Sequence, residues 1–404
     1  MGRSPQLKVL VVLASALVAI VVLIAADFLG SLVWRPSPVT IHKPYVAKPD
    51  GWYELQPNFA GHDQFGPYIY AVETDAHGFR RKPGATPPAV YDVIFLADSF
   101  TYGMNGAWDD TFVGMYANDT SKSVLNAGVA SYSPTAYLHQ YRKAASASLL
   151  SRGHTVVIAL DVSDVQDEAG IWTDGDMHPK KVLPPSAPVT PAAAPATPGA
   201  PAPAPASAPA APEPAPGWTA VDVRAAVIDA LPNTWAVYRF LRYDLARWNR
   251  AELVEFPRSA FTYRPWAELD REPAVLQQGY APLGVAGGLQ RVEQKVLEIM
   301  QTADRFDARV FVLIYPWPAQ VANADRFSWS AFASDICRRG SCAGVIDTIP
   351  IFRALAAQRR DWLNVYYVSG DTHFSRVGNR VVADAVIKAL SPQRSANHRA
   401  RFRR

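Results

Sequence analysis

The chain has 404 residues, of which 49% are hydrophobic and 19% are charged, so it is long and apolar enough to bury a sizeable core and is not disordered throughout. Its formal net charge of +4 comes from the C-terminal end, since residues 394–404 hold five arginines and the rest of the chain sums to −1. We therefore expect one large or two ordinary domains and no nucleic-acid binding.

The N-terminal segment is the most apolar part of the chain. Residues 9–26 are eighteen consecutive uncharged residues, and a further apolar stretch follows. This length suffices to span a bilayer, which predicts a membrane anchor over residues 9–34. Positive charges at Arg3 and Lys8 precede the span, so residues 1–8 are expected in the cytoplasm and the remainder of the chain outside it. A cleaved signal peptide and a buried core helix are the alternatives.

Short apolar runs alternate with helical patterns along the rest of the chain. The strand pattern, rich in Val, Ile, Leu and Tyr, occurs at Tyr91–Ala97, Ser123–Asn126, Thr155–Leu160, Arg309–Tyr315 and Leu363–Val368. Helical spacing of apolar residues occurs at 134–153, 289–306 and 375–390. Strands that alternate with helices favour right-handed crossovers. They predict a doubly wound α/β domain with a five-stranded parallel sheet and helices on both faces.

A low-complexity block interrupts this pattern. Residues 184–216 contain 13 of the 34 prolines, which predicts an extended, polyproline-like insertion. Residues 221–248 follow with helical spacing and are expected to cover a core. We therefore expect one domain over residues 89–392 that holds this insertion, a lead-in segment over 35–88 and a basic disordered tail over 393–404. Contact of the tail with anionic lipids or polymers is the alternative.

The chain has two cysteines, Cys337 and Cys342, in the sequence 337-CRRGSC-342. This spacing suits a small loop disulfide in an oxidising compartment, and two thiols are too few for a closed zinc site. A disulfide agrees with export of the domain. Two unpaired thiols are the alternative, because the spacing alone does not give the geometry of the Cβ atoms.

Polar groups follow each predicted strand. In an open parallel sheet, ligands bind beyond the carboxyl ends of the strands. The residues at these ends are, in chain order, Asp98 and Ser99, Gly128, 161-DVSDVQDE-168, 315-YPWP-318 and 370-GDTHF-374. One rim of the sheet is therefore expected to collect a hydroxyl, a glycine N–H, polar and aromatic side chains, and an Asp–His pair.

These groups predict a nucleophilic site. A serine hydroxyl becomes a nucleophile when an imidazole takes its proton, and a carboxylate fixes the tautomer of that imidazole and stabilises its charge. We expect Ser99, His373 and Asp371 to fill these three roles. The backbone N–H groups of Ser99 and Gly128 are the expected donors to the oxyanion. A helix cap at Ser99 and a surface turn at Asp371 and His373 are the structural alternatives.

Four blocks in this order resemble the SGNH or GDSL-type hydrolases, whose pattern is Gly-Asp-Ser, a glycine, Gly-x-Asn-Asp and an Asp–His pair. The blocks here are 97-ADS-99, Gly128, 161-DVSD-164 and 371-DTH-373. Ala97 replaces the family glycine, and Ser163 stands where the family has an oxyanion-stabilising asparagine. The resemblance implies a flavodoxin-like SGNH fold with Ser163 as a third, weaker oxyanion donor. We expect Asp98 and Asp164 to be structural acceptors that support the site.

Two further details resemble particular branches of this family. The segment 74-TDAHGFR-80 resembles the lead-in of membrane-anchored members found with bacterial polysaccharide systems, and the short Asp–His spacing is similar to that of relatives that acetylate exopolysaccharides. The resemblance implies an inner-membrane, periplasm-facing esterase or O-acyltransferase that acts through an acyl-enzyme on Ser99. Its substrate would be O-acetyl groups on a cell-envelope polysaccharide, its partner an integral-membrane O-acyltransferase, and it would need no metal or cofactor.

Two other functions remain as alternatives. A non-catalytic module that binds glycan or organises an envelope complex would explain Ala97 and Ser163, and a lipid esterase would explain the membrane anchor. The other histidines have no matching acid and are expected to be structural: His62, His139, His154 and His178. Three tryptophans are expected to pack in the core or at interfaces, with stacking on sugar rings as the alternative: Trp172, Trp266 and Trp317.

Overall fold

The computed structural model describes residues 5–33, 43–48, 52–65, 68–104, 106–174, 179–181, 280–323, 327–368 and 371–391. The predicted Pro/Ala insertion, the helical pattern at 221–248 and the basic tail lie outside these residues, as do His178 and Trp266. All described elements after the first helix belong to one compact unit, and the first helix is described by itself.

The N-terminal helix α1 (Pro5–Val33) has no polar stripe that would mark one face as solvent-exposed. Its stretch Leu13–Gly30 has a mean hydropathy of 2.4. At 1.5 Å per residue, the 29 residues of the helix extend roughly 43 Å. α1 is therefore long and apolar enough to cross a membrane, as the sequence predicts. A signal sequence near the N-terminus passes the same test of length and composition.

The compact unit contains both strands and helices. The strands are β1 (Tyr45–Ala47), β2 (Tyr53–Leu55), β3 (Ala60–Phe65), β4 (Tyr68–Thr74), β5 (Arg80–Arg81), β6 (Tyr91–Leu96), β7 (Val124–Asn126), β8 (Leu150–Leu160), β9 (Trp172–Asp174), β10 (Pro179–Lys181), β11 (Arg309–Ile314) and β12 (Gly344–Asp347). The helices are α2 (Ser99–Tyr102), the short 3-10 helix η2 (Trp108–Asp110), α3 (Phe112–Thr120), α4 (Pro134–Ser146), α5 (Val162–Gly170), α12 (Gly284–Asp304), α13 (Pro318–Ala322), α14 (Trp329–Gly340), α15 (Ile349–Ala357), α16 (Trp362–Tyr366) and α17 (Arg376–Leu390).

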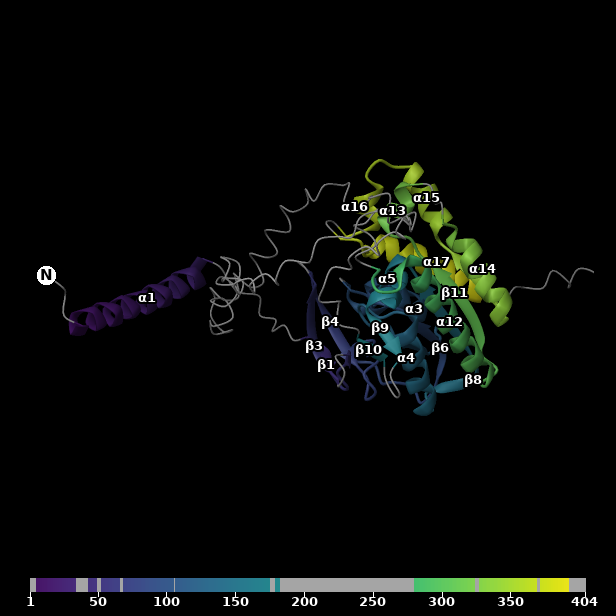
Figure 1. Cartoon of the computed structure of the whole chain (residues 1–404), viewed down its shortest axis with the longest axis horizontal. Coiled ribbons are helices and arrows are strands. Elements are labelled where there is room, and N and C mark those ends of the chain that lie inside the picture. The colour runs from purple at the N-terminus through teal and green to yellow at the C-terminus, as the bar shows by residue number, and fades with distance from the viewer. Residues whose placement is uncertain are drawn as a thin grey trace, which may run out of the picture. The chain divides into compact units, whose positions relative to one another are not determined.

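Eight strands form the main sheet, in the order β12-β11-β8-β6-β7-β5-β4-β3. The strands from β12 to β7 are parallel, and β5, β4 and β3 continue the sheet in antiparallel pairs. Figure 1 shows the β3–β4 hairpin at one side of the compact unit and β11 at the other. β6, the first parallel strand along the chain, lies between β7 and β8, so the strand order reverses there. Open α/β sheets bind ligands beyond the carboxyl ends of the strands at such a point.

The sheet differs from the predicted one in two respects. It has eight strands, not five, because the lead-in segment adds β3, β4 and β5. Most of the predicted strand Leu363–Val368 belongs instead to helix α16, and Tyr367 makes only an isolated bridge with Phe374. The fifth parallel strand is β12. A short apolar run does not distinguish a strand from a turn of buried helix, which explains this error. The other four predicted strands lie in the sheet as β6, β7, β8 and β11.

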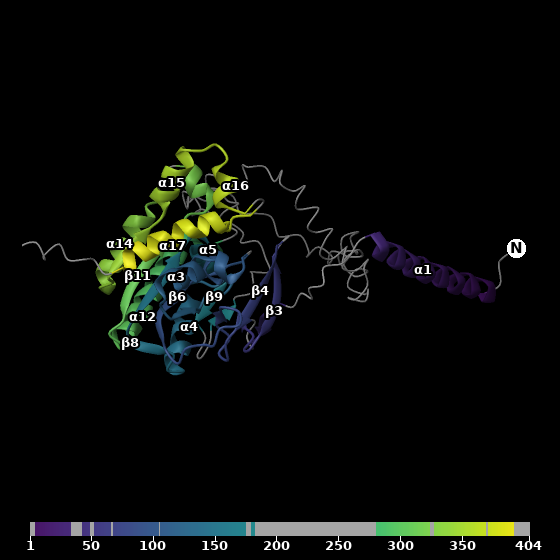
Figure 2. The same ribbon diagram turned by 180° about the vertical axis from the view of Figure 1, so that it is seen from behind.

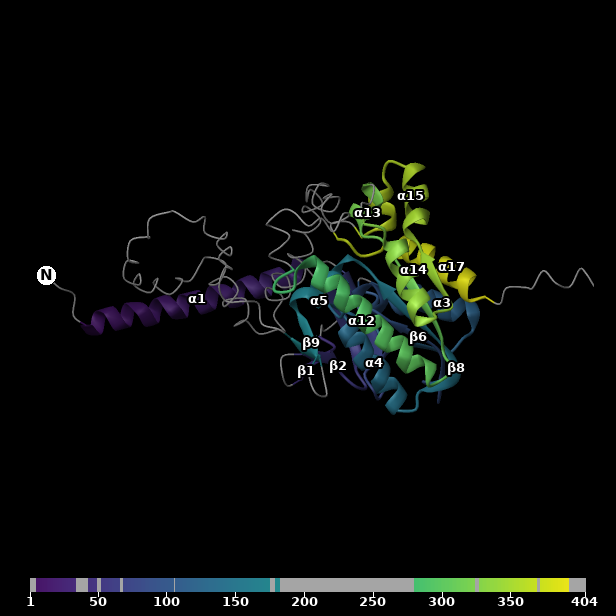
Figure 3. The ribbon, with the colours of Figure 1, turned by 45° about the vertical axis from the view of Figure 1, so that its right-hand side comes forward.

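Helices pack over the parallel strands. α3 contacts α17, and Figure 2 shows this pair in front of the sheet. α12 contacts α4, α5 and α14. Figure 3 shows α12 in front of the strands, on the face of the sheet opposite to α3 and α17. The strand residues between these helices are buried, with at most 1% of each side chain exposed in Val156–Leu160 and Val312–Ile314. Strands covered in this way need continuous apolar sequences, which is why β6, β8 and β11 are recognisable in the sequence.

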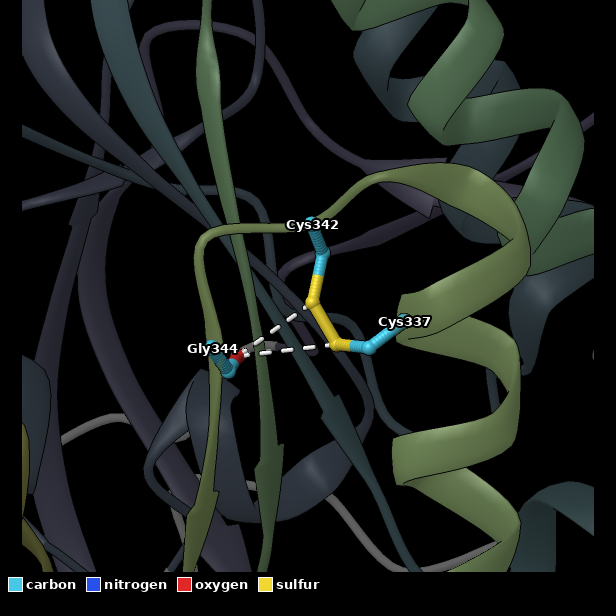
Figure 4. The surroundings of a disulfide bond; sticks show 3 residues. All are labelled: Cys337, Cys342 and Gly344. Atoms are coloured by element: carbon cyan, nitrogen blue, oxygen red, sulfur yellow. Dashed lines mark hydrogen bonds between the residues drawn. A yellow bond between two sulfur atoms is a disulfide. The ribbon is translucent and has the colours of Figure 1, made fainter.

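Cys337 and Cys342 form a disulfide, with Cα atoms 4.7 Å apart. Cys337 belongs to the last turn of α14, and Cys342 lies in the turn that leads into β12. Figure 4 shows both sulfur atoms beside the Gly344 carbonyl oxygen, at 3.7 and 3.5 Å. The disulfide therefore joins the end of a helix to the start of the outermost parallel strand. This arrangement agrees with the expectation of an oxidising compartment.

Candidate active site

Ser99 is the first residue of the one-turn helix α2, which begins directly beyond the carboxyl end of β6. Asp98 caps this helix, and its Oδ1 accepts a hydrogen bond from the Phe100 N–H at 3.0 Å. The helix ends at Gly103, which has φ 84, a left-handed conformation that favours glycine. The apolar strand, the Asp98 cap and the Gly103 turn together hold the Ser99 hydroxyl at the switch point of the sheet.

The structure brings Ser99, His373 and Asp371 together in one hydrogen-bonded chain. The Ser99 Oγ lies 2.7 Å from His373 Nε2, and His373 Nδ1 lies 2.7 Å from Asp371 Oδ1. Asp371 Oδ1 also accepts the backbone N–H of His373 at 3.1 Å. Because a carboxylate is an acceptor only, Nδ1 is the protonated ring nitrogen and Nε2 is left to accept the serine proton. This is the orientation in which an imidazole activates a serine nucleophile.

Two aromatic rings flank the imidazole of His373. The ring of Phe100, from α2, has its centroid 4.7 Å from that of His373. The ring of Phe65, from the end of β3, meets His373 edge to face at 5.5 Å. The side chains of His373 and Asp371 are each only 12% exposed. These contacts restrict the rotation of the imidazole and shield the Asp–His pair from water.

The predicted oxyanion donors differ in whether they already make a hydrogen bond to another group of the protein. The Gly128 N–H donates to the side-chain Oδ1 of Asn126 at 2.9 Å. The Ser163 hydroxyl lies 2.6 Å from Asp161 Oδ1, which also accepts the Ser163 N–H. Within the described part of the chain, the Ser99 N–H makes no hydrogen bond. Among the three predicted donors, the Ser99 N–H is therefore the one that is available to bind an oxyanion.

Gly128 has a structural requirement that the sequence did not reveal. A Cβ at this position would lie 2.3 Å from the backbone nitrogen of Tyr102 and 2.9 Å from the Thr101 Cβ. The turn after β7 therefore packs directly against α2, and only glycine allows this approach. Ala97, which stands where the resembled pattern has glycine, is fully buried at the end of β6.

Three carboxyl groups that follow the carboxyl ends of β6 and β8 are buried: Asp98, Asp161 and Asp164. The Tyr315 hydroxyl donates to Asp98 Oδ1 at 2.7 Å, and the Trp317 indole N–H donates to Asp161 Oδ2 at 2.9 Å. Asp164 accepts the Tyr137 hydroxyl at 2.6 Å and the Asp161 N–H at 2.8 Å. Asp98 and Asp164 thus each accept two hydrogen bonds from neighbouring segments. Asp161, to which the sequence analysis assigned no role, belongs to the same cluster.

Burial raises the pKa of each carboxyl group in this cluster. Burial and the neighbouring Asp161 carboxylate raise the pKa of Asp98 from 3.8 to about 7. The pKa values of Asp161 and Asp164 are raised for the same first reason, and Asp161 raises that of Asp164 further. Within the described residues, no group of three or more His, Cys, Asp or Glu side chains is arranged to hold a metal ion, this cluster included.

The Ser163 hydroxyl lies between two of these carboxyl groups. The Ser163 Oγ lies 2.6 Å from Asp161 Oδ1 and 3.4 Å from Asp98 Oδ2, and the hydroxyl has one proton for the two carboxyl groups. The shorter contact is the one to Asp161. The longer contact is more favourable when the Asp98 carboxyl is neutral, the form that its raised pKa favours.

Asp98→Asn is expected to make stability less dependent on pH. The pKa of Asp98 is raised in the folded protein. The stability that Asp98 contributes is therefore fully present below pH 3.8 and is lost as the pH rises to about 7. An asparagine oxygen still accepts from Phe100 and Tyr315, and its amide replaces the donor on Oδ2. In thermal unfolding, the melting temperature of the variant should therefore rise relative to that of the wild type between about pH 4 and pH 7.

Asp119→Asn is the matched control for this prediction, since Asp119 is an exposed carboxylate paired with Arg380. It should show no comparable gain with rising pH. If Asp98→Asn instead loses stability relative to the wild type as pH rises, Asp98 must be ionised in the folded protein.

A buried arginine holds the other end of α2. The Arg80 side chain is 1% exposed and donates to the carbonyl oxygens of Tyr102, Gly103 and Gly106. Its guanidinium carbon also lies 5.0 Å from the centroid of the Tyr102 ring. These carbonyls belong to the turn after α2, so Arg80 fixes the helix whose first residue is Ser99. The segment 74-TDAHGFR-80 does not by itself indicate this role of Arg80.

The other described histidines and tryptophans that the sequence singles out contact further parts of the compact unit. The Trp172 indole N–H donates to the Ser131 carbonyl at 2.9 Å, and Trp317 is held by Asp161. His139 packs edge to face on Trp52 at 4.4 Å, and His154 lies 2.9 Å from the Tyr141 hydroxyl. His62 belongs to β3. None of these described histidines is hydrogen-bonded to Ser99, His373 or Asp371.

Comparisons with known proteins add little to this geometry. No family model and no curated protein matches the chain. Among solved structures, the chain is similar to a protein from Desulfitobacterium hafniense DCB-2 that is proposed to be a lipolytic member of the G-D-S-L family. The two share 11% identity, over 74% of this chain and 98% of that chain, with a TM-score of 0.35. The chemistry of the site is therefore argued from its own residues.

Proposed function

We propose that this chain is a serine-dependent esterase or O-acyltransferase that forms an acyl-enzyme on Ser99. The observation that carries the proposal is the hydrogen-bonded chain from Ser99 Oγ through His373 to Asp371, with both distances at 2.7 Å. Its position at the start of a helix, beyond the central strand of the sheet, supports the same function. The order of the four blocks that resemble SGNH hydrolases supports it further.

Acylation follows from the geometry. His373 Nε2 takes the hydroxyl proton as Ser99 Oγ attacks the ester carbonyl, and the Ser99 N–H donates to the oxyanion that forms. The Asp371 carboxylate stabilises the imidazolium through Nδ1. His373 then gives the proton to the leaving alcohol, the C–O bond breaks, and the acyl group remains on Ser99.

Deacylation repeats these steps with a second alcohol or with water. His373 removes a proton from the incoming hydroxyl, which attacks the acyl-Ser99 ester, and Ser99 recovers its proton when its bond to the acyl carbon breaks. Water as the acceptor gives an esterase. A sugar hydroxyl as the acceptor gives an O-acyltransferase.

The substrate we propose is an O-acetyl group on a cell-envelope polysaccharide. The short Asp–His spacing in 371-DTH-373 and the segment 74-TDAHGFR-80 support this choice, since both resemble members linked to bacterial polysaccharides. We further propose that α1 anchors the chain in the inner membrane with the compact unit in the periplasm, where the Cys337–Cys342 disulfide is stable. An integral-membrane O-acyltransferase would be the partner that supplies acetyl groups.

One observation favours a second candidate, a non-catalytic module that binds glycan or organises an envelope complex. The Gly128 N–H and the Ser163 hydroxyl are both engaged by other side chains. Loss of a single oxyanion donor lowers kcat by about 10²- to 10³-fold in a serine hydrolase. A site with so few free donors would suit a protein that has kept the fold and lost the reaction. For a lipid esterase, α1 is the only support.

Mass spectrometry of the protein after brief exposure to an activated acetyl ester tests the proposal. We expect one acetyl group on the peptide that contains Ser99, because the acyl-enzyme is a covalent intermediate. Faster loss of this group with an oligosaccharide than with water would establish an O-acyltransferase, and equal loss an esterase. If Ser99 stays unmodified while the protein is folded, the non-catalytic candidate is correct.

A further inference from the structure

A buried acid in the lead-in segment is bonded to the nucleophile helix. Asp63, in β3, is 2% exposed, and its Oδ2 accepts the hydroxyl groups of Tyr102, from α2, and of Tyr70, from β4, each at 3.1 Å. Burial raises the pKa of both tyrosines well above the ordinary value, so both hydroxyls keep their protons and can donate. Asp63 therefore connects the edge strand β3 to the helix that begins with Ser99.

Arg80 holds the same helix by a second set of contacts. Its guanidinium carbon lies 5.0 Å from the centroid of the Tyr102 ring and 5.6 Å from that of the Tyr70 ring. The guanidinium also donates to the carbonyl oxygens of Tyr102 and Gly103. A one-turn helix has little stability of its own, since its first turn fixes several residues for a single hydrogen bond. The contacts of Tyr102 with Asp63 and Arg80 therefore determine where α2 lies.

The same strand reaches the catalytic imidazole. Phe65 comes two residues after Asp63, so the two side chains lie on the same face of β3. The ring of Phe65 meets that of His373 edge to face, with centroids 5.5 Å apart. Ser99 begins α2, whereas His373 belongs to the loop before α17. β3 is therefore in contact with both segments that form the site, with α2 through Asp63 and with the imidazole through Phe65.

We propose that Asp63 is a positioning residue of the active site, because its hydrogen bond with Tyr102 holds α2 where the Ser99 Oγ can reach His373 Nε2. This inference rests on the proposed function and adds the lead-in segment to the parts of the chain that the reaction needs. The 2.7 Å between Ser99 Oγ and His373 Nε2 depends on how α2 lies relative to the loop of His373. A displacement of about 1 Å between reacting groups can lower a rate about 10²-fold. Loss of the bond should therefore lower kcat and leave KM nearly unchanged.

Tyr102→Phe removes this hydrogen bond and keeps the aromatic ring. We expect it to lower kcat for release of acetate from methyl acetate by about 5- to 50-fold, with KM changed by less than about twofold, because a small shift of α2 displaces the reacting atoms. The measurement uses the full chain, purified in detergent. In an Asp63→Ala background, the same substitution should lower kcat by less than about a further twofold, since the bond is already absent.

Tyr70→Phe is the matched control. It removes a hydroxyl that donates to the same Oδ2 atom of Asp63 at the same distance, from a side chain that is also buried. β3 and β4 are joined by antiparallel pairing along the full length of β3, so the hairpin does not depend on that hydroxyl. Tyr70→Phe should therefore change kcat by less than about twofold, while its midpoint of thermal unfolding stays within about 2 °C of that of Tyr102→Phe.

Three results would overturn the proposal. Equal values of kcat for Tyr102→Phe and Tyr70→Phe would show that the two hydroxyls only stabilise the fold. An increase in KM at unchanged kcat would show that Tyr102 affects the binding of the ester and not the position of Ser99. A loss of kcat in the Asp63→Ala background as large as in the wild-type background would show that Tyr102 acts through another group.

A spectroscopic comparison separates this inference from the proposed function. In nitrogen NMR spectra of protein labelled at histidine, Ser99→Ala identifies the His373 Nε2 signal and the change that follows the loss of its hydrogen bond with Ser99. We expect Tyr102→Phe to move this signal towards its position in Ser99→Ala, and Tyr70→Phe to leave it in place. A protein that cleaves no ester would contradict the proposed function, and the signal would still test the role of Asp63. An Nε2 signal that Tyr102→Phe leaves unchanged would overturn that role.

Discussion

Replacing Ser99 with alanine is expected to lower kcat for ester cleavage by about 10⁴- to 10⁶-fold, because the variant lacks the oxygen that attacks the carbonyl. His373 Nε2 then has no hydroxyl at 2.7 Å to deprotonate, and the remaining rate comes from water and from the Ser99 N–H, which the substitution leaves in place. Release of acetate from methyl acetate by the full chain, purified in detergent, measures the effect. The acetyl mark on the Ser99 peptide should disappear in the same variant.

The substitution should leave the fold unchanged. The hydrogen bond of the Ser99 hydroxyl within the described residues is the one to His373, while the cap of α2 is made by Asp98. We therefore expect the midpoint of thermal unfolding to stay within about 2 °C of the wild type. Ser146→Ala, at the exposed end of α4, is the matched control and should keep the wild-type kcat. A Ser99→Ala protein with more than about a tenth of the wild-type kcat would contradict catalysis by Ser99.

The position of Ser99 at the end of β6 was predictable because local sequence determines it. An apolar strand that is buried on both faces leaves a clear pattern, and Asp98-Ser99 follows β6 without an intervening loop. Asp371 and His373 meet Ser99 although the element before them is helix α16 and not a strand. They do so because the chain returns to the carboxyl end of the sheet in either case.

The hydrogen-bond partners of the oxyanion donors were not predictable in the same way. Whether the Gly128 N–H faces the substrate depends on the rotamer of Asn126, two residues earlier. Whether the Ser163 hydroxyl does so depends on Asp161, which is buried behind the site. In each case, competing acceptors lie a few ångströms apart. Residue type and spacing do not determine which acceptor the donor bonds.

The hairpin at the site was missed for a different reason. β3 and β4 form an edge of the sheet, where one side of each strand is exposed and the apolar alternation is weak. Phe65 meets His373, from the other end of the chain, through a tertiary contact that no local pattern encodes. The buried Asp63 that fixes the hairpin would be taken for a surface acid in the sequence, because its partners are the distant hydroxyl groups of Tyr70 and Tyr102.

Asp371→Asn is expected to lower kcat by about 10²- to 10⁴-fold, less than the loss of Ser99, because the amide keeps the shape of the side chain and removes its charge. Asp371 Oδ1 accepts both the His373 N–H and Nδ1–H. If the amide oxygen keeps that position, the correct tautomer is retained and only the stabilisation of the imidazolium is lost. If the amide nitrogen turns towards Nδ1 instead, the proton moves to Nε2, which then cannot accept the Ser99 proton, and the loss reaches the upper end of the range.

A double variant distinguishes this role from a general effect on the fold. Because Asp371 acts through His373 on Ser99, Ser99→Ala combined with Asp371→Asn should be no slower than Ser99→Ala alone. Asp384→Asn, in an exposed ion pair with Arg380, is the control and should not change kcat. If kcat of the double variant is lower than that of Ser99→Ala by the same factor that Asp371→Asn alone causes, Asp371 acts independently of Ser99. The proposed chain from Asp371 through His373 to Ser99 would then be wrong.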